Sequence, residues 1–391
     1  MNKLLLISFA VLSALILIVF LVVIFLSGYF EPDSDTVIEP TAEVFLPVQT
    51  TSTREEVIRS LTEFINSSMN SDGNFVSRYR CEFRNCLPQV ELEKYVSYPI
   101  LALLSAEVSG DEGVNFKDRA NLATDSVFAS CEKNAQVCSD NLAILYKYYQ
   151  DTEDVLYKNL ILSVATEDYV EDRIATQSQT QLIDDNFFKK VEIFYDVTGD
   201  NKYKQIIVDA ADETLENWPY GLNGASMYVA EIYPVTFDMP LAINGLLLPA
   251  CRITGDRDYC SRAEEFYLNV SLADNMNAFA SQGEVGTIAL LNAVEGLTVL
   301  NSMNETNLDL KPIFASEATL LMNRLIGWYY DSPSRVVFNG DGGILTGFVR
   351  DVPDPNGVNY KRVSIDGWIA VLLQDPVFEG LDLQLYTRVA N

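Results

Sequence analysis

Residues 183–216 read IDDNFFKKVEIFYDVTGDNKYKQIIVDAADETLE, and this stretch contains the pattern from which the fold can be predicted. Up to Val197 it is apolar on several faces, which is typical of a helix that is buried on most sides. Thr198-Gly-Asp200 then supplies a glycine that ends one helix and an aspartate that caps the next. From Tyr203 to Leu215 the apolar residues form one stripe with acidic residues opposite. The stretch therefore predicts an inner helix, a tight turn and an outer helix.

The same hairpin pattern recurs along the chain. Polar turns stand at Ser109–Asp111, Asp151–Asp154, Thr198–Asp200, Thr254–Asp256, Met303–Thr306 and Gln374–Pro376. Each follows an apolar segment, and these segments are Tyr95–Val108, Asn141–Tyr149, Ile183–Val197, Phe237–Ile253, Glu284–Leu300 and Val363–Leu373. With a first outer helix at Thr53–Ser67, the pattern predicts six outer-inner hairpins. We expect an additional terminal helix at Glu379–Val389.

An array of six such hairpins resembles the (α/α)6 toroid, the six-hairpin fold of many glycoside hydrolases and polysaccharide lyases. The resemblance covers nearly the whole of residues 52–391 and rests on the organisation of the hairpins. It implies an all-α toroid of six outer-inner helical hairpins. An open α-solenoid built from the same hairpins is the structural alternative. The repeat count of six favours the closed toroid.

The N-terminus carries an uncharged apolar run, Leu4–Leu26, that is long enough at helical rise to cross a bilayer. A cleaved signal peptide has a shorter apolar core, so we predict a transmembrane signal-anchor helix. Lys3 precedes the run and acidic residues follow it, which places residues 1–3 in the cytoplasm. Residues 27–51 predict an extended stalk. We therefore expect a single-pass protein of the cell membrane with an extracytoplasmic domain at residues 52–391.

The chain has 391 residues, a formal net charge of −28 and no histidine. Nucleic-acid binding requires a basic surface, so the charge excludes a nucleic-acid partner. The absence of histidine excludes Ser-His-Asp and Cys-His catalysis and removes the commonest zinc ligand. Asn339-Gly-Asp-Gly-Gly343 lacks the spaced carboxylates of a calcium loop and predicts a hairpin turn within Val336–Leu345. We expect no metal site and no cofactor.

Six cysteines form three close pairs, Cys81 with Cys86, Cys131 with Cys138, and Cys251 with Cys260. In an oxidising compartment each pair can close a small local loop, so we predict three local disulfides. Other pairings and buried free thiols are the alternatives. Three sequons, at Asn66, Asn269 and Asn304, predict N-glycosylation of an exported surface.

The connections from outer to inner helices are long, and they gather at the end where the inner helices begin. They span Asn70–Leu92, Thr166–Gln181, Trp218–Thr236 and Gly327–Arg362. Functional residues tend to lie on loops above a rigid core. Four carboxylates fall at the starts of inner helices: Asp185, Asp238, Glu284 and Asp366. Six aromatic residues on or beside the connections can stack on sugar rings: Trp218, Tyr220, Tyr233, Trp328, Tyr330 and Trp368.

Hydrolysis of a glycosidic bond needs two carboxyl groups in different environments, one protonated and one ionised. The resemblance to six-hairpin enzymes, whose reactive groups lie at this end, implies Asp238, Glu284 and Asp366 as acid-base candidates, with Asp185 behind them. Helix capping is the alternative role for each carboxylate, and packing onto the ring is the alternative for the aromatics. Many six-hairpin lyases and epimerases use a histidine, so its absence favours hydrolysis.

We therefore expect a membrane-anchored, carbohydrate-active protein, with a glycoside hydrolase as the main hypothesis. A noncatalytic glycan-binding or cell-envelope assembly scaffold is the alternative. The partners implied are the membrane, through the N-terminal span, and a glycan or cell-envelope polymer. The sequence identifies no protein partner.

Overall fold

The computed structural model describes residues 47–82, 85–106, 115–216, 227–230, 233–235, 238–273, 284–330 and 358–388. They belong to one compact unit, Pro47–Arg388. Within these ranges, none of the helices combines the length and the apolar character that crossing a bilayer requires. The predicted span Leu4–Leu26 and the predicted stalk up to residue 46 lie outside the described residues.

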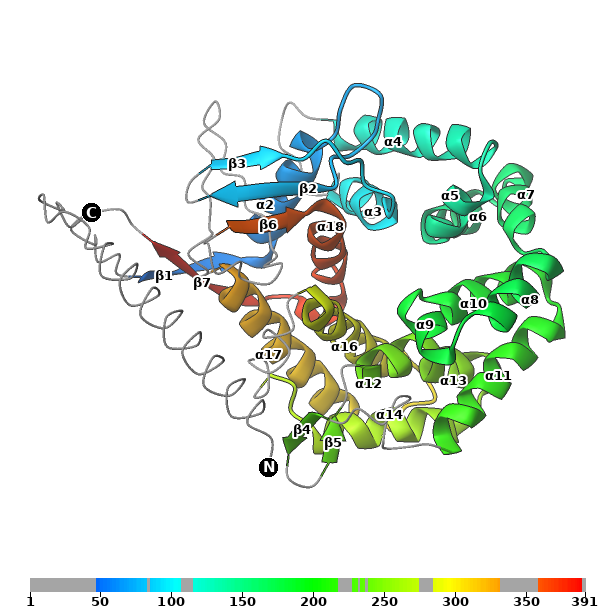
Figure 1. Cartoon of the computed structure of the whole chain (residues 1–391). Coiled ribbons are helices and arrows are strands. Elements are labelled where there is room, and N and C mark those ends of the chain that lie inside the picture. The colour runs from blue at the N-terminus through cyan, green and yellow to red at the C-terminus, as the bar shows by residue number, and fades with distance from the viewer. Residues whose placement is uncertain are drawn as a thin grey trace, which may run out of the picture. The chain divides into compact units, whose positions relative to one another are not determined.

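Six inner helical segments follow one another around a ring in Figure 1. They are α3 (Ser97–Ala106), α6 (Leu142–Thr152), α10 (Phe187–Thr198), α12 to α13 (Asp238–Thr254), α16 (Glu284–Ser302) and α18 (Val363–Leu372). Each packs against the next, and α18 packs against both α16 and α3. The last inner helix therefore contacts the first, which confirms the closed toroid over the open solenoid.

Six outer helices complete the hairpins. They are α2 (Arg54–Ser67), α4 (Phe116–Cys131), α7 (Val155–Val164), α11 (Asn201–Glu216), α14 (Arg257–Asn269) and α17 (Lys311–Tyr330). The apolar core lies between the two layers, where Phe194 of α10 and Phe266 of α14 are fully buried. Burial of such rings stabilises the fold by about 2 kcal/mol each. The six predicted outer-inner pairs are thus confirmed.

The predicted helix-ending turns have the expected geometry. Gly199 and Gly255 adopt left-handed φ angles of 68° and 72° at the ends of α10 and α13. The side chain of Asp200 then accepts a hydrogen bond from the backbone N–H of Lys202 at 3.0 Å. Asp256 caps α14 in the same way. A residue with a Cβ atom is strained at such a φ angle, which explains the glycines.

A proline and a glycine shape two of the inner helices. Pro249 cannot donate the hydrogen bond that an α-helix requires, and the turn before it, Ile243–Leu247 (η2), is a π-helix.

Gly367 of α18 lies against α3, and a Cβ atom there would stand 2.5 Å from the backbone nitrogen of Pro99. The glycine therefore permits the close approach that closes the ring.

One face of α10 carries a polar stripe at helical spacing, which differs from the expectation of an inner helix that is apolar nearly all round. We call its three pairs the interior ladder: Lys189 with Glu295 of α16 at 3.0 Å, Glu192 with Arg252 of α13 at 2.8 and 2.6 Å, and Asp196 with Tyr146 of α6 at 2.8 Å. All three partners belong to inner helices, so the ladder connects four of the six inner segments.

Three small sheets correct the all-α expectation. β1 (Pro47–Thr53) pairs antiparallel with β7 (Asp382–Arg388). β2 (Arg78–Glu82) lies between β3 (Asn85–Pro88) and β6 (Val358–Arg362), and β4 (Met227–Ala230) pairs with β5 (Tyr233–Val235). The predicted terminal helix at Glu379–Val389 is wrong, because residues 382–385 alternate polar and apolar side chains with the period of a strand. β1 also includes the last residues of the predicted stalk, so the compact unit begins at Pro47 rather than at Ser52.

The long connections hold more regular structure than expected. Thr166–Gln181 contains helix α8 (Glu167–Thr176) and part of α9 (Gln179–Asp184), and α5 (Ala135–Asp140) precedes α6. α17 continues to Tyr330, so the connection predicted to begin at Gly327 begins later. The turn predicted at Ser109–Asp111 and the hairpin predicted at Val336–Leu345, with Asn339–Gly343, lie outside the described residues.

Two of the predicted disulfides are confirmed. Cys131 at the end of α4 is bonded to Cys138 of α5, and Cys251 of α13 is bonded to Cys260 of α14 with an S–S distance of 2.00 Å. The register of β2 and β3 places Cys81 opposite Cys86, but their side chains lie outside the description. The Cys131–Cys138 bond fixes the short helix α5 to the outer layer.

The three predicted sequons differ in accessibility. Asn269 and Asn304 are exposed. Asn66 is half-buried in α2, and its side-chain oxygen accepts a hydrogen bond from Arg119 at 3.1 Å. Glycosylation of Asn269 and Asn304 stays a prediction, and Asn66 is the least accessible of the three.

Candidate active site

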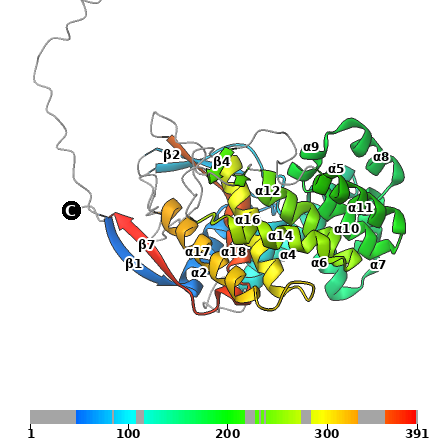
Figure 2. The same cartoon turned by 90° about the horizontal axis from the view of Figure 1, so that it is seen from below.

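The end of the ring at which the six inner helices begin is called the mouth here. Figure 2 shows β2, β4, α5, α8, α9 and α12 along one edge of the unit. All of these elements precede or begin an inner helix, so the connections do gather at the mouth. The predicted gathering of the connections at this end therefore agrees with the described structure.

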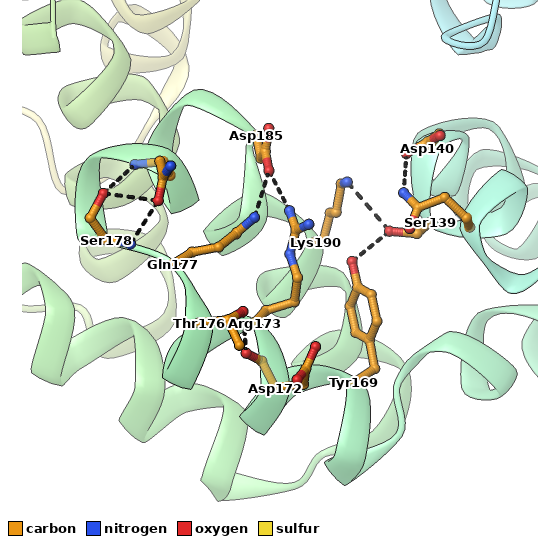
Figure 3. Close-up of polar contacts among 12 residues, drawn as sticks. Ser139, Asp140, Tyr169, Asp172, Arg173, Thr176, Gln177, Ser178, Asp185 and Lys190 are labelled. Carbon is orange, nitrogen blue, oxygen red and sulfur yellow. Dashed lines mark hydrogen bonds and ion pairs between the residues drawn. The ribbon is translucent and has the colours of Figure 1, made fainter.

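Asp185 is the predicted carboxylate that the structure places in a polar site. It lies in the turn between α9 and α10, and its backbone N–H is held by the last turn of α9. Its side chain is 44% exposed and forms an ion pair with Arg173 of α8. The side-chain amide of Gln177 lies 3.5 Å from the same carboxylate oxygen, Oδ2. Asp185 is thus an accessible carboxylate held by an adjacent cation (Figure 3).

The other three predicted carboxylates are not brought together with Asp185 by any described contact. Asp238 and Glu284 are the first residues of α12 and α16, and their side chains lie outside the description. Asp366 lies in the first turn of α18 and is fully buried. Because α18 packs closely on α3 at this point, Asp366 cannot reach a substrate without a movement of its side chain or helix.

The predicted aromatic residues are only partly described. Trp218 and Tyr220 lie outside the described residues, whereas Tyr233 belongs to β5 and both Trp328 and Tyr330 belong to the last turns of α17, with side chains that are not described. Trp368 is 7% exposed and stacks on Tyr98 of α3, with ring centroids 5.1 Å apart. Its stacking joins α18 to α3, so its described role is packing.

A group of charged and polar side chains that we call the mouth cluster surrounds Asp185. It consists of Glu93, Tyr95, Asp140, Arg173, Asp185 and Lys190, which come from the segment before α3, from α5, α8 and α10, and from the turn between α9 and α10. Tyr95 connects its members, because burial and the charges of Asp140, Asp185 and Glu93 all raise the pKa of the Tyr95 hydroxyl. Three carboxyl groups therefore lie within electrostatic range of one exposed tyrosine.

Glu93 has an environment opposite to that of Asp185. Burial raises the pKa of Glu93, although hydrogen bonds from the N–H of Tyr95 and the hydroxyl of Ser364 act against the rise. The backbone N–H groups of Lys94 and Tyr95 donate to Glu93 Oε1 at 3.0 and 3.2 Å. A carboxyl group with a raised pKa is suited to carry a proton near neutral pH.

Lys190 supplies the second cation of the mouth cluster. It lies in the first turn of α10, and its amino group donates to Ser139 Oγ at 3.4 Å. Burial lowers the pKa of Lys190, and the charges of Asp140 and Asp185 oppose this effect. An ammonium group has three donors, so Lys190 retains donors for a bound ligand.

Buried polar side chains fix the elements that carry the mouth cluster. Asn141 caps the junction of α5 and α6, where its side-chain oxygen accepts from the N–H of Val96 at 2.8 Å and its amide donates to Lys94 at 2.9 Å. Ser139 is fully buried and lies 2.6 Å from the hydroxyl of Tyr169 in α8. These bonds tie the start of α3, α5 and α8 together around the site.

The sequence contained a usable signal for part of the mouth cluster. Asp140 directly precedes the predicted inner segment Asn141–Tyr149, so the rule that selected Asp185 also selects Asp140. Lys190 and Arg173 were missed because only carboxylates and aromatics were considered. Glu93 was missed because its burial depends on β2 and β6, which the sequence pattern did not predict.

Within the described ranges, no group of three or more acidic or cysteine side chains has an arrangement that could hold a metal ion.

Comparison with known proteins identifies the fold. No family model matches the chain, and no curated protein matches it in sequence. An unsaturated glucuronyl hydrolase variant from Streptococcus agalactiae has a TM-score of 0.53 and 14% identity, covering 83% of this chain and 91% of that chain. The unsaturated glucuronyl hydrolase from Bacillus sp. GL1 has a TM-score of 0.53 and 13% identity, covering 87% and 100%.

The GH76A α-1,6-mannanase from Salegentibacter sp. has a TM-score of 0.54 and 12% identity, covering 83% of this chain and 99% of that chain. These glycosidases share the (α/α)6 toroid. The chain therefore has the fold that its hairpin pattern predicted, and at these identities the likeness concerns the fold alone.

Proposed function

We propose that this protein is a glycoside hydrolase whose active site is the mouth cluster. The observation that carries the proposal is the contrast between two of its carboxyl groups: Glu93, whose pKa is raised by burial, and Asp185, which is paired with Arg173. Both lie within electrostatic range of Tyr95. Glycosidases use one protonated and one ionised carboxyl group, and different environments produce this difference.

In the proposed reaction Glu93 donates its proton to the glycosidic oxygen as the bond to the anomeric carbon breaks. Asp185, in its ionised form, either attacks the anomeric carbon or removes a proton from an attacking water molecule. Lys190 donates hydrogen bonds to substrate hydroxyl groups, and the exposed ring of Tyr95 contacts the apolar face of the sugar. Among the four carboxylates chosen from the sequence, the proposal retains Asp185 and adds Glu93.

We further propose that the enzyme acts outside the cytoplasm while anchored in the cell membrane. The support is the apolar run Leu4–Leu26 together with the acidic residues that follow it. The disulfides Cys131–Cys138 and Cys251–Cys260 also support an oxidising compartment. A glycan of the cell envelope is then the accessible class of substrate.

The test is hydrolysis of a panel of cell-envelope glycans by the purified full chain, with reducing ends as the readout. We expect Glu93→Gln and Asp185→Asn each to lower kcat by at least about a hundredfold, because acid-base groups contribute factors of this size. Asp172→Asn is the matched control, since Asp172 is an exposed carboxylate on α8 next to Arg173. Equal activity of Asp185→Asn and Asp172→Asn would remove Asp185 from the reaction.

The alternative, a noncatalytic glycan-binding or assembly scaffold, predicts a different result. The chain would then bind glycans without releasing reducing ends, and Glu93→Gln would not alter binding. Asp366 is compatible with such a structural role, because it is fully buried where α18 meets α3. The contrasting environments of Glu93 and Asp185 favour the hydrolase.

A further inference from the structure

Helix α8 presents three polar side chains to the mouth. Tyr169, Arg173 and Gln177 are four residues apart, so they follow one face of the helix and its C-terminal cap. Figure 3 shows all three directed toward neighbouring elements. Tyr169 contacts Ser139 of α5, and Arg173 and Gln177 both contact Asp185.

Hydrophobic burial contributes little to the position of α8. Among the residues of α8 whose burial is described, Val170 is the one that is buried, at 2% exposure. A helix with so small an apolar contact area gains little from hydrophobic burial. The polar face is therefore what places α8 against α5 and the start of α10.

The contacts to Asp185 leave its two oxygens in different states. Arg173 and Gln177 both approach Oδ2. Oδ1 has no hydrogen-bond partner among the described residues. The backbone of Asp185 is fixed by the turn at the end of α9, but the side chain is half exposed and depends on Arg173 for its orientation. One oxygen is thus held by two side chains, while the other is left without a hydrogen-bond partner among the described residues.

We propose that Arg173 is the positioning residue of the active site: it holds Asp185 Oδ2 in an ion pair and thereby orients the carboxylate so that Oδ1 is available to the reacting centre. This inference rests on the proposed hydrolase function. A fixed orientation of a reacting group is worth a large factor in rate. Arg173 itself takes no part in bond making or breaking.

Lys190 of α10 and Tyr95 before α3 also lie near Asp185, because the charge of Asp185 acts on both of them. Arg173 is the cation in direct contact with the carboxylate. Loss of Arg173 therefore removes the contact that orients Asp185, while Lys190 stays in place.

The experiment compares kcat and KM of the full chain with those of its Arg173→Gln and Arg173→Lys variants on the glycan that the wild type cleaves. We expect Arg173→Gln to lower kcat by about tenfold to a hundredfold. We expect KM to stay close to that of the wild type, because Arg173 orients the reacting carboxylate and does not bind the substrate. Arg173→Lys restores the charge and should recover part of the lost kcat.

Arg262→Gln is the matched control, because Arg262 forms an exposed pair with Glu265 at 2.9 Å on the outer helix α14. It should leave kcat and KM unchanged. A kcat of Arg173→Gln equal to that of the wild type overturns the positioning role while the hydrolase function stands. A wild-type chain that releases no reducing ends overturns the hydrolase function and, with it, this inference.

Discussion

Adjacent residues of α10 belong to two regions that treat charge differently. Lys189 belongs to the interior ladder and contacts the carboxylate of Glu295 at 3.0 Å. Lys190 belongs to the mouth cluster, and its described hydrogen-bond partner is the hydroxyl of Ser139 at 3.4 Å. In the ladder, Glu192 uses both carboxylate oxygens on Arg252. In the mouth cluster, Asp185 uses one.

The difference indicates two roles for charged side chains in one fold. Pairs between inner helices, as in the interior ladder, hold these helices in register. Groups with unused donors or acceptors are poorly satisfied by the protein itself, and polar groups of this kind are expected at functional sites. At the mouth, Arg173 Nε and Gln177 Oε1 are further buried atoms without a described partner.

The largest expected effect is on the stability of the closed ring, which carries both the interior ladder and the mouth cluster. Gly367→Ala places a Cβ atom 2.5 Å from the nitrogen of Pro99 and 2.7 Å from the backbone carbon of Tyr98. Neither backbone atom can move without separating α18 from α3, so we expect a loss of about 3 kcal/mol in the free energy of unfolding. Urea-induced unfolding measures it.

Gly245→Ala is the matched control for the ring. Gly245 also lies in an inner helix, but the nearest atom to an added Cβ atom is the carbonyl oxygen of Ile183 at 3.9 Å. Its stability should stay within about 1 kcal/mol of the wild type. If Gly367→Ala were as stable as Gly245→Ala, the close packing of α18 on α3 that we describe would be wrong.

Substitution of the adjacent lysines, Lys189 and Lys190, tests the two roles directly. Lys190→Met should lower kcat/KM by about tenfold to a hundredfold, because a charged donor to the substrate contributes about 1.5 to 3 kcal/mol. Its free energy of unfolding should not fall, since burial already disfavours the ammonium form. Lys189→Met should do the reverse: it leaves Glu295 without its cation and should destabilise the fold by about 1 to 2 kcal/mol.

Steady-state kinetics and urea-induced unfolding of both variants provide the measurement. Each variant is the control for the other, because the two residues are neighbours and the substitution is the same. If both variants lost stability and kept kcat/KM, the mouth cluster would have no role in binding and would resemble the ladder.

Local sequence patterns predicted the ring but not its contacts. The hairpins are encoded within about 40 residues each, by turns such as Thr198–Asp200 and by helical periodicity, so six pairs could be recognised. β7 was mistaken for a helix because its partner β1 stands at the other end of the chain. Asp366 was expected to be accessible, but closure of the ring packs α3 over the start of α18.

The same limitation applies to the mouth cluster. Asp185 could be selected because it stands at the start of an inner segment. Its partner Arg173 could not, because helix α8 interrupts a stretch that was predicted as an irregular connection. Glu93 is functional in our proposal through its burial, and burial depends on long-range strand pairing between β2 and β6. Local patterns thus located the end at which the connections gather, whereas long-range packing selected the residues of the mouth cluster.

The smallest expected effect concerns the pH dependence of stability at Glu93. Burial raises the pKa of Glu93 in the folded protein above its usual value, so folding favours the protonated form. The stability that this group contributes is fully present below its usual pKa and is lost as pH rises through the raised pKa. Glu93→Gln mimics the protonated form at every pH. Its free energy of unfolding should therefore improve relative to the wild type as pH rises from about 4 to about 8.

Urea-induced unfolding across this pH range measures the difference, with Glu91→Gln as the control because Glu91 is exposed two residues earlier. A constant difference between Glu93→Gln and the wild type would show that Glu93 is as well solvated in the fold as in the unfolded chain. Glu93 would then have no reason to carry a proton near neutral pH. The proposed acid would have to be sought elsewhere, and Asp140 is the remaining carboxyl group of the mouth cluster.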